Sequence, residues 1–133
     1  MKLHKALLVC TFLFSLSVSG FAFALDCKNP QTQIDMNQCA SADLDRETKK
    51  INKTYNNFRA KLNSTQKQQF KEVQLAWIKF KDLACQFEAS GVEGGSAHSM
   101  VLAGCLTEKT RQRNKELEAL ANCQEGDLSC PTW

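Results

Sequence analysis

The chain has 133 residues, of which 43% are hydrophobic, and a formal net charge of +3. This length corresponds to one domain with room for a hydrophobic core. Residues 1–24 hold two of the 17 Lys and Arg and none of the 14 Asp and Glu, so residues 25–133 carry 15 − 14 = +1. A charge so close to zero provides no electrostatic footprint for nucleic acid or an anionic membrane surface, and neither is expected as a partner.

The N-terminal segment has the features of a signal peptide in the usual order. Lys2 and Lys5 precede an apolar run from Ala6 to about Val18, and Ala22-Phe23-Ala24 supplies the small residues that signal peptidase accepts. We predict a signal peptide over residues 1–24, cleaved after Ala24, and therefore export to the periplasm or the extracellular medium. A retained membrane anchor is the weaker alternative, because serines and a glycine interrupt the apolar run.

Six cysteines remain once Cys10 is removed with the signal peptide. An even number in a short exported chain is typical of a disulfide framework. Although six cysteines allow 15 pairings, pairing between neighbours is favoured: Cys27–Cys39, Cys85–Cys105 and Cys123–Cys130. A zinc site is not expected, since residues 25–133 have no C-x2-C pair and a single histidine. No metal or other cofactor is predicted.

The first half of the domain is predicted to be helical, because no glycine or proline occurs between Pro30 and Gly91. Asn29-Pro30 has the form of a helix start. Ser41 or Asp43 could cap a second start, so this region holds either one long helix or a short one followed by a long one. Its apolar residues follow helical spacing: Met36, Ala40, Leu44, Ile51, Tyr55, Phe58 and Leu62.

Two further helices are expected after the polar turn Asn63-Ser64-Thr65. A segment from Ala89 to about Ala97 contains three glycines and is the clear internal loop. The apolar residues before this loop are Phe70, Val73, Trp77, Phe80, Ala84 and Phe87. Those after it are Val101 or Leu102, Leu106, Leu117 and Leu120, with Arg113 on the same face. Tyr55, Trp77 and Phe80 are predicted to belong to the core.

These patterns predict an all-α domain, a small antiparallel bundle of three to four helices held by disulfides. Residues 25–121 form the helical domain, and residues 122–133 form a tail closed by Cys123–Cys130. Cys85 and Cys105 flank the glycine loop, so their bridge would join two antiparallel helices and restrain that loop. Cys27–Cys39 would tie the N-terminal segment to the first helix.

Residues for catalysis are not apparent. His98 is the only histidine after the signal peptide, and it has no nucleophile at a plausible spacing. Carboxylate pairs could be drawn from Asp82, Glu88 and Glu93, but nothing singles them out. Asp82 is more simply explained by an ion pair with Arg113, or with the nearby Arg111, on a neighbouring helix. The chain is therefore not predicted to be an enzyme.

The domain resembles the LprI-like lysozyme inhibitor N-terminal domain family over about residues 26–120. The resemblance rests on short elements in a fixed order together with the cysteine spacing. Lys81 departs from the family pattern, which commonly has an arginine there. If the site recognises a carboxylate, a lysine cannot make the bidentate contact that an arginine makes. The tail with Cys123 and Cys130 lies outside the family core. The matching elements are Asp26-Cys27, Thr32-Gln33, Met36–Ala40, Ile51-Asn52, Tyr55, Gln74–Asp82, Cys85, Gly94–Ala97, Cys105, Thr110, Arg113 and Leu117.

The resemblance implies a bacterial periplasmic or surface module that inhibits lysozyme or a related peptidoglycan hydrolase without catalytic residues. If so, the glycine loop is the expected contact with the hydrolase, because a restrained loop loses less entropy on docking. The loop groups expected to bind are Glu93, Gly94, Gly95, Ser96 and His98. The alternative is a periplasmic structural or interaction module, or an immunity protein, that has no effect on lysozyme.

Overall fold

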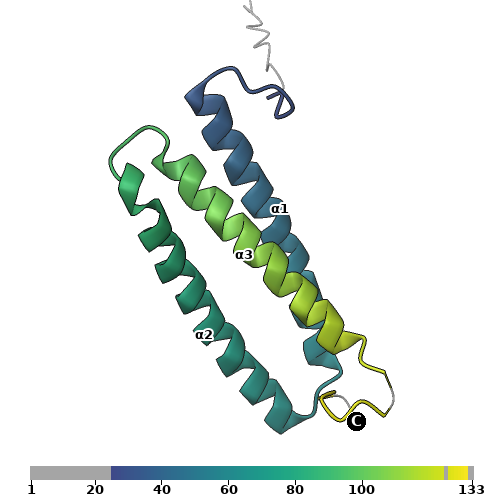
Figure 1. Ribbon diagram of the computed structural model, residues 1–133. Coiled ribbons are helices and arrows are strands. Elements are labelled where there is room, and N and C mark those ends of the chain that lie inside the picture. Colours follow the sequence, from purple (N-terminus) through teal and green to yellow (C-terminus); the bar gives the residue numbers. More distant parts are fainter. Residues whose placement is uncertain (1–24, 125, 132–133) are drawn as a thin grey trace, which may run out of the picture.

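The computed structural model describes residues 25–124 and 126–131, and the signal peptide predicted over residues 1–24 lies outside this part. Three α-helices account for most of it: α1 (Gln33–Ala60), α2 (Ser64–Ala89) and α3 (His98–Ala121). A single 3-10 turn, η1 (Ser90–Val92), follows α2. The chain runs along α1, back along α2 and forward again along α3 (Figure 1). No strand occurs among the described residues, so this part of the protein is all-α.

Side-chain caps determine where the first two helices begin. The Thr32 hydroxyl accepts a hydrogen bond from the Asp35 N–H at 3.1 Å, and the Asp35 carboxylate accepts one from the Thr32 N–H at 3.0 Å. This capping box, and not Asn29-Pro30, starts α1, because it satisfies backbone donors that a helix end leaves free. α1 is continuous, so Asp43 caps no second start and instead pairs with Arg46 within the helix.

α2 begins with a capping box of the same kind. The Asn63 side chain accepts from the Gln66 N–H, and the Gln66 side chain accepts from the Asn63 N–H. The amide of Gln66 also donates to the carbonyl of Pro131, which holds the C-terminal tail against the start of α2. α3 starts after Ala97 with no side-chain cap.

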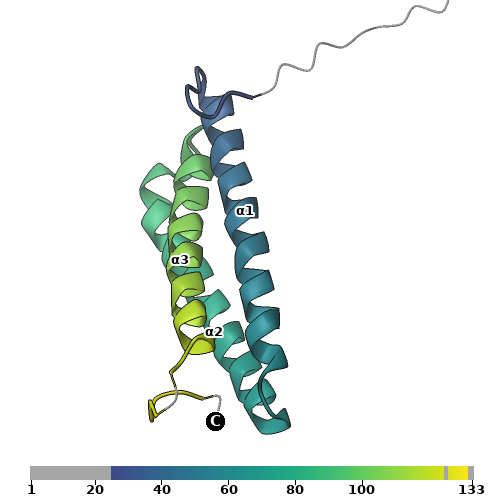
Figure 2. The ribbon, with the colours of Figure 1, turned by 90° about the vertical axis from the view of Figure 1, so that its right-hand side faces the viewer.

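The hydrophobic core lies towards the turn between α1 and α2. The Phe70 ring of α2 stacks on Tyr55 at 4.7 Å and meets Phe58 edge-on at 5.0 Å, both centroid distances. Trp77 packs against this cluster while remaining partly exposed. Figure 2 shows α2 crossing behind α3 and coming close to α1 at this end of the bundle. The buried members of the core are Ile51, Phe58, Leu62, Phe70 and Leu117.

The face that α3 buries differs from the predicted one. The expected residues Leu106 and Arg113 are only partly buried, whereas Leu117 is fully buried as expected. Small and polar residues take the innermost positions, and an apolar pattern does not mark such positions. They allow α1 and α3 to approach closely along their length. The buried residues of α3 are Ala103, Thr107, Thr110, Asn114 and Leu117.

The three disulfides join neighbouring cysteines. Cys27–Cys39 ties the N-terminal segment to α1, and Cys85–Cys105 joins α2 to α3. Cys123–Cys130 closes the tail. Their Cα–Cα distances of 5.5, 5.6 and 5.5 Å lie within the usual range for a bridge.

The prediction that Phe80 belongs to the core is wrong. Its side chain is 62% exposed, and that of Phe87, one heptad later, is 80% exposed. The reason is angular: α2 turns Phe70, Gln74 and Cys85 inward, and Phe80 projects from a different side of the helix. Helical spacing identifies residues that share a face, but not which face the bundle covers.

The predicted ion pair between Asp82 and Arg113 is also absent. Asp82 pairs with its neighbour Lys81 at 3.3 Å, and Arg113 pairs with Glu116 at 2.9 Å. The guanidinium of Arg113 also donates to the amide oxygen of Gln74 at 3.4 Å and lies 6.0 Å from the Trp77 ring centroid. Arg113 therefore joins α3 to α2 through an amide and an aromatic ring.

Candidate functional site

The glycine loop that the sequence predicts as a contact surface lies between η1 and α3, at one end of the bundle. It is a series of tight turns: the Gly95 N–H donates to the Val92 carbonyl at 3.1 Å, and the His98 N–H donates to the Gly95 carbonyl at 3.2 Å. Gly94 has a φ of +75°, which L side chains rarely adopt. The backbone conformation thus depends on a glycine at this position.

Two bonds, together with the burial of the last residue of α2, hold this loop in place. The Cys85–Cys105 bridge joins the helices on either side of it. The amide of Asn37, on α1, donates to the carbonyl of Ser96 at 3.0 Å. Ala89, at the end of α2, is fully buried. The loop is therefore fastened to all three helices and presents a defined shape.

The predicted loop residues do come together at this end of the molecule. Glu93, Gly94, Gly95 and Ser96 are exposed, whereas His98 is half-buried as the first residue of α3. A carboxylate and a hydroxyl are thus available on a restrained loop. This arrangement suits binding.

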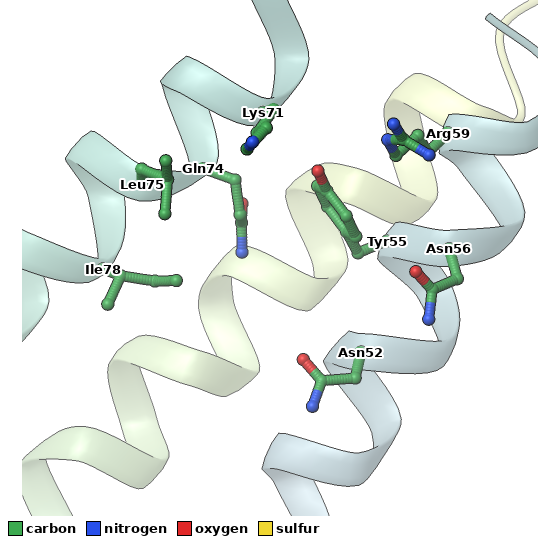
Figure 3. Close-up of a pocket in the computed structure, with 8 residues that line it drawn as sticks. All are labelled: Asn52, Tyr55, Asn56, Arg59, Lys71, Gln74, Leu75 and Ile78. Carbon is green, nitrogen blue, oxygen red and sulfur yellow. The ribbon is translucent and has the colours of Figure 1, made fainter. Parts of the chain in front are cut away.

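A groove between α1 and α2 is a second candidate that the sequence did not indicate. It has a volume of about 410 Å³. Figure 3 shows its two walls: Tyr55 and the amides of Asn52 and Asn56 come from α1, and Leu75 and Ile78 come from α2, with α3 behind them. Arg59, Lys71 and Gln74 complete the lining, which contains no carboxylate.

A smaller cavity of about 100 Å³ continues this groove, since both are lined by Asn52, Gln74 and Ile78. It adds Trp77 and Lys81, whose ammonium lies 5.4 Å from the Trp77 ring centroid. The lysine that departs from the family pattern thus contributes a third cation to the groove.

The groove brings together segments that are distant in the sequence. Asn52 and Tyr55 belong to one element of the family resemblance, whereas Gln74 and Trp77 belong to another. From the sequence, these elements indicate only the family resemblance, and Tyr55 and Trp77 are predicted to be core residues. The polar positions Lys71 and Gln74, three residues apart beside an apolar face, are the signal that could have indicated a groove.

The described residues also bear on metal binding and on membrane insertion. Within residues 25–124 and 126–131, no group of three or more His, Cys, Asp or Glu side chains could hold a metal ion. None of the helices in that part is long and apolar enough to span a bilayer.

The fold and these surfaces define a class: a small, disulfide-bridged helical bundle with a restrained loop and a polar groove. A family model described as "Lysozyme inhibitor LprI" matches residues 26–117, which is more than half of the chain. The chain belongs to this family.

The related proteins carry no assigned function. An uncharacterized protein of Rhizobium meliloti (strain 1021) is 33% identical over 113 residues, covering 75% of this chain and 81% of the relative. An uncharacterized protein of Rickettsia conorii is 51% identical over 35 residues, covering 24% of this chain and 69% of the relative. No solved structure matches the chain.

Proposed function

We propose that this protein is an exported, non-catalytic inhibitor of a lysozyme-type peptidoglycan hydrolase, and that the loop from Glu93 to His98 contacts the enzyme. Membership of the lysozyme inhibitor family supports the class of target. The observation that carries the choice of surface is the bracing of the loop by Cys85–Cys105 and by the Asn37–Ser96 hydrogen bond.

Bracing favours binding because a loop that is already ordered has less conformational entropy to lose in the complex. Glu93 and Ser96 then provide polar groups that a hydrolase cleft can accept. The net charge of about +1 after residue 24 gives little long-range attraction towards a basic enzyme, so affinity would depend on such local contacts.

A lysis assay tests the proposal. Purified Leu25–Trp133 is added in excess to a bacterial cell-wall suspension with each of several lysozyme types, and turbidity is followed. We expect slower lysis, with an inhibitory concentration that rises at least tenfold in the double variant Glu93→Ala/Ser96→Ala. A matched control, Asp45→Ala/Ser64→Ala, also removes one carboxylate and one hydroxyl, at exposed sites outside the loop, and should inhibit normally.

The possible outcomes test the inhibitor function and the role of the loop separately. Undiminished lysis with every lysozyme type would overturn the inhibitor function. Inhibition that survives the loop variant would overturn the role of the loop. Export belongs to the same proposal, and the mature protein recovered outside the cytoplasm should begin at Leu25.

The groove favours a second candidate, an envelope interaction module or immunity protein that leaves lysozyme unaffected. Arg59 and Lys71 line the groove with no carboxylate beside them, which suits an acidic segment of a protein partner. Photo-crosslinking from position 56 in intact cells, with and without Arg59→Glu/Lys71→Glu, distinguishes the two. A crosslinked partner lost in this variant, together with no effect on lysis, would favour this alternative.

A further inference from the structure

A line of exposed apolar side chains runs along α2. Val73, Phe80, Leu83 and Phe87 are 52%, 62%, 57% and 80% exposed, and the exposed Ala76 lies between the first two. We call these five residues the α2 stripe. No charged residue interrupts it, although charged residues such as Glu72 and Lys79 lie beside it on the helix.

The rest of the described chain leaves this stripe uncovered. α2 contacts α3 through another side, which includes Trp77 and Cys85. α3 reaches the stripe at its edges. The Lys109 ammonium lies 5.9 Å from the Phe80 ring centroid and pairs with Glu88 at 3.0 Å, and Val73 borders a hollow that Arg113 and Leu120 also line. Figure 1 shows α2 at the outer edge of the bundle.

The spacing of the stripe indicates what kind of surface covers it. Its members follow one another at intervals of three, four, three and four residues. This is the heptad repeat by which one α-helix packs against another, with Val73, Phe80 and Phe87 at one core position and Ala76 and Leu83 at the other. A helix laid along α2 would fit this pattern better than a globular cleft.

The sizes of the stripe residues make α2 complementary to itself in one direction. In a parallel pair of α2 helices, Phe80 would face Phe80 and Ala76 would face Ala76. The packing layer at Phe80 would then be crowded, and the layer at Ala76 would leave a void. Antiparallel copies place the two heptad positions opposite each other, so each large ring faces a smaller side chain. Such alternation of large and small residues gives a layer of even thickness.

We propose that the α2 stripe is the interface of a symmetric homodimer in which α2 packs antiparallel against α2 of a second copy. The stripe spans 14 residue steps, about 21 Å of helix. Aromatic side chains such as Phe80 and Phe87 can bury about 150–250 Å² each. Four such rings in the dimer, two from each copy, would bury about 600–1,000 Å², which is below the size of a standard interface, so the dimer is modest in size and dissociates on dilution.

Analytical ultracentrifugation of Leu25–Trp133 over a range of concentrations tests the dimer. We expect a shift from monomer to dimer as concentration rises. Phe80→Glu should remain monomeric throughout, because it places two charges in an apolar interface. Ile34→Glu is the matched control: Ile34 is a 68% exposed apolar residue on α1, outside the stripe, and its variant should dimerise like the parent.

Circular dichroism checks that each variant is folded, which we expect because both side chains are largely exposed. A parent protein that is monomeric up to millimolar concentration would overturn the proposal. So would a Phe80→Glu dimer. A monomeric parent whose lysozyme inhibition is lost in Phe80→Glu would assign the stripe to the hydrolase instead. The assembly measurement needs no hydrolase and so stands or falls independently of the inhibitor function.

Spin labels attached through an unnatural amino acid test the orientation without adding a thiol. A label at Lys79, near the centre of the stripe, should lie close to its symmetry mate. Facing Phe80 with Leu83, and Phe87 with Ala76, places the symmetry axis midway between Phe80 and Leu83. A label at Gln69 should therefore be separated from its mate by about 38 Å along the helix, because each lies about 12.5 residues from that axis. Short distances at both positions would overturn the antiparallel arrangement.

Discussion

The pairing of α1 with α3 and the attachment of α2 use different kinds of residue. α1 and α3 pack along their length, with Thr107 and Asn114 buried between the helices and an ion pair between Glu47 and Arg111 at 3.7 Å beside them. α2 is held mainly near its two ends, by the aromatic contacts of Phe70 and by the Cys85–Cys105 bridge. Several of its large apolar side chains, such as Phe80 and Phe87, remain exposed to solvent.

This difference separates two properties of a helix: how many apolar side chains it carries, and how firmly the rest of the chain holds it. Small and polar side chains of α3, such as Ala103 and Thr107, take buried positions in the longer interface, where they let two helices approach. Large apolar side chains lie on the helix that is less covered, where they are available to another molecule. The apolar content of a helix therefore does not indicate how firmly the rest of the chain holds it, and the experiments below test each attachment separately.

The aromatic attachment should show the largest effect. Phe58→Ala removes a side chain that is 1% exposed, and we expect the free energy of unfolding to fall by about 3–5 kcal/mol. Phe80→Ala is the matched comparison at a 62% exposed site. At concentrations where the protein is monomeric, equilibrium denaturation should show a loss below about 1 kcal/mol there. Equal losses would contradict the assigned difference in burial.

The bridge at the other end of α2 comes next. Cys85→Ala/Cys105→Ala opens a loop with a sequence separation of 20 and should lower the free energy of unfolding by about 3 kcal/mol in the chain-entropy model. Amide hydrogen exchange should accelerate in the C-terminal half of α2 and in the loop after it. The control, Cys27→Ala/Cys39→Ala, should accelerate exchange only at the start of α1; acceleration spread evenly over the bundle would refute local fastening.

Helix capping offers a smaller and more symmetrical test. Asn63→Ala removes the cap of α2, and Thr32→Ala removes that of α1. Each should lower the free energy of unfolding by about 1 kcal/mol. Because the Gln66 of the α2 capping box also holds the tail at Pro131, only Asn63→Ala should change the NMR shifts of residues 129–131. Unchanged tail shifts would show that this contact does not depend on the cap.

The smallest expected effect has the opposite sign. The hydroxyl of Thr107 is buried and has no hydrogen-bond partner among the described residues. Thr107→Val keeps the branched shape and removes the unpaired group, so we expect thermal unfolding to indicate a gain of less than about 1 kcal/mol. Thr48→Val, at an exposed position on α1, should change stability little. A loss at Thr107 would mean that its hydroxyl has a partner.

The sequence supports the helices and bridges better than it supports their packing. Glycine and proline placement outlined the helices, and cysteine spacing indicated the observed pairs. The prediction of buried residues from the sequence failed at Phe80 and on α3 for the same reason. Periodicity shows which residues share a face of a helix, whereas the angle at which the helices cross decides which face is buried. The loop could be anticipated from its glycines. The groove could not, because Asn52 and Gln74 approach one another only after α1 and α2 have packed on α3.

The order of the three bridges bears on how the protein is made. Each joins a cysteine to the next cysteine of the domain, and no bridge encloses or crosses another. A chain delivered N-terminus first into an oxidising compartment therefore presents both partners of each bridge before the next pair arrives. The order of arrival alone then favours the correct bridges, and little isomerisation is needed afterwards.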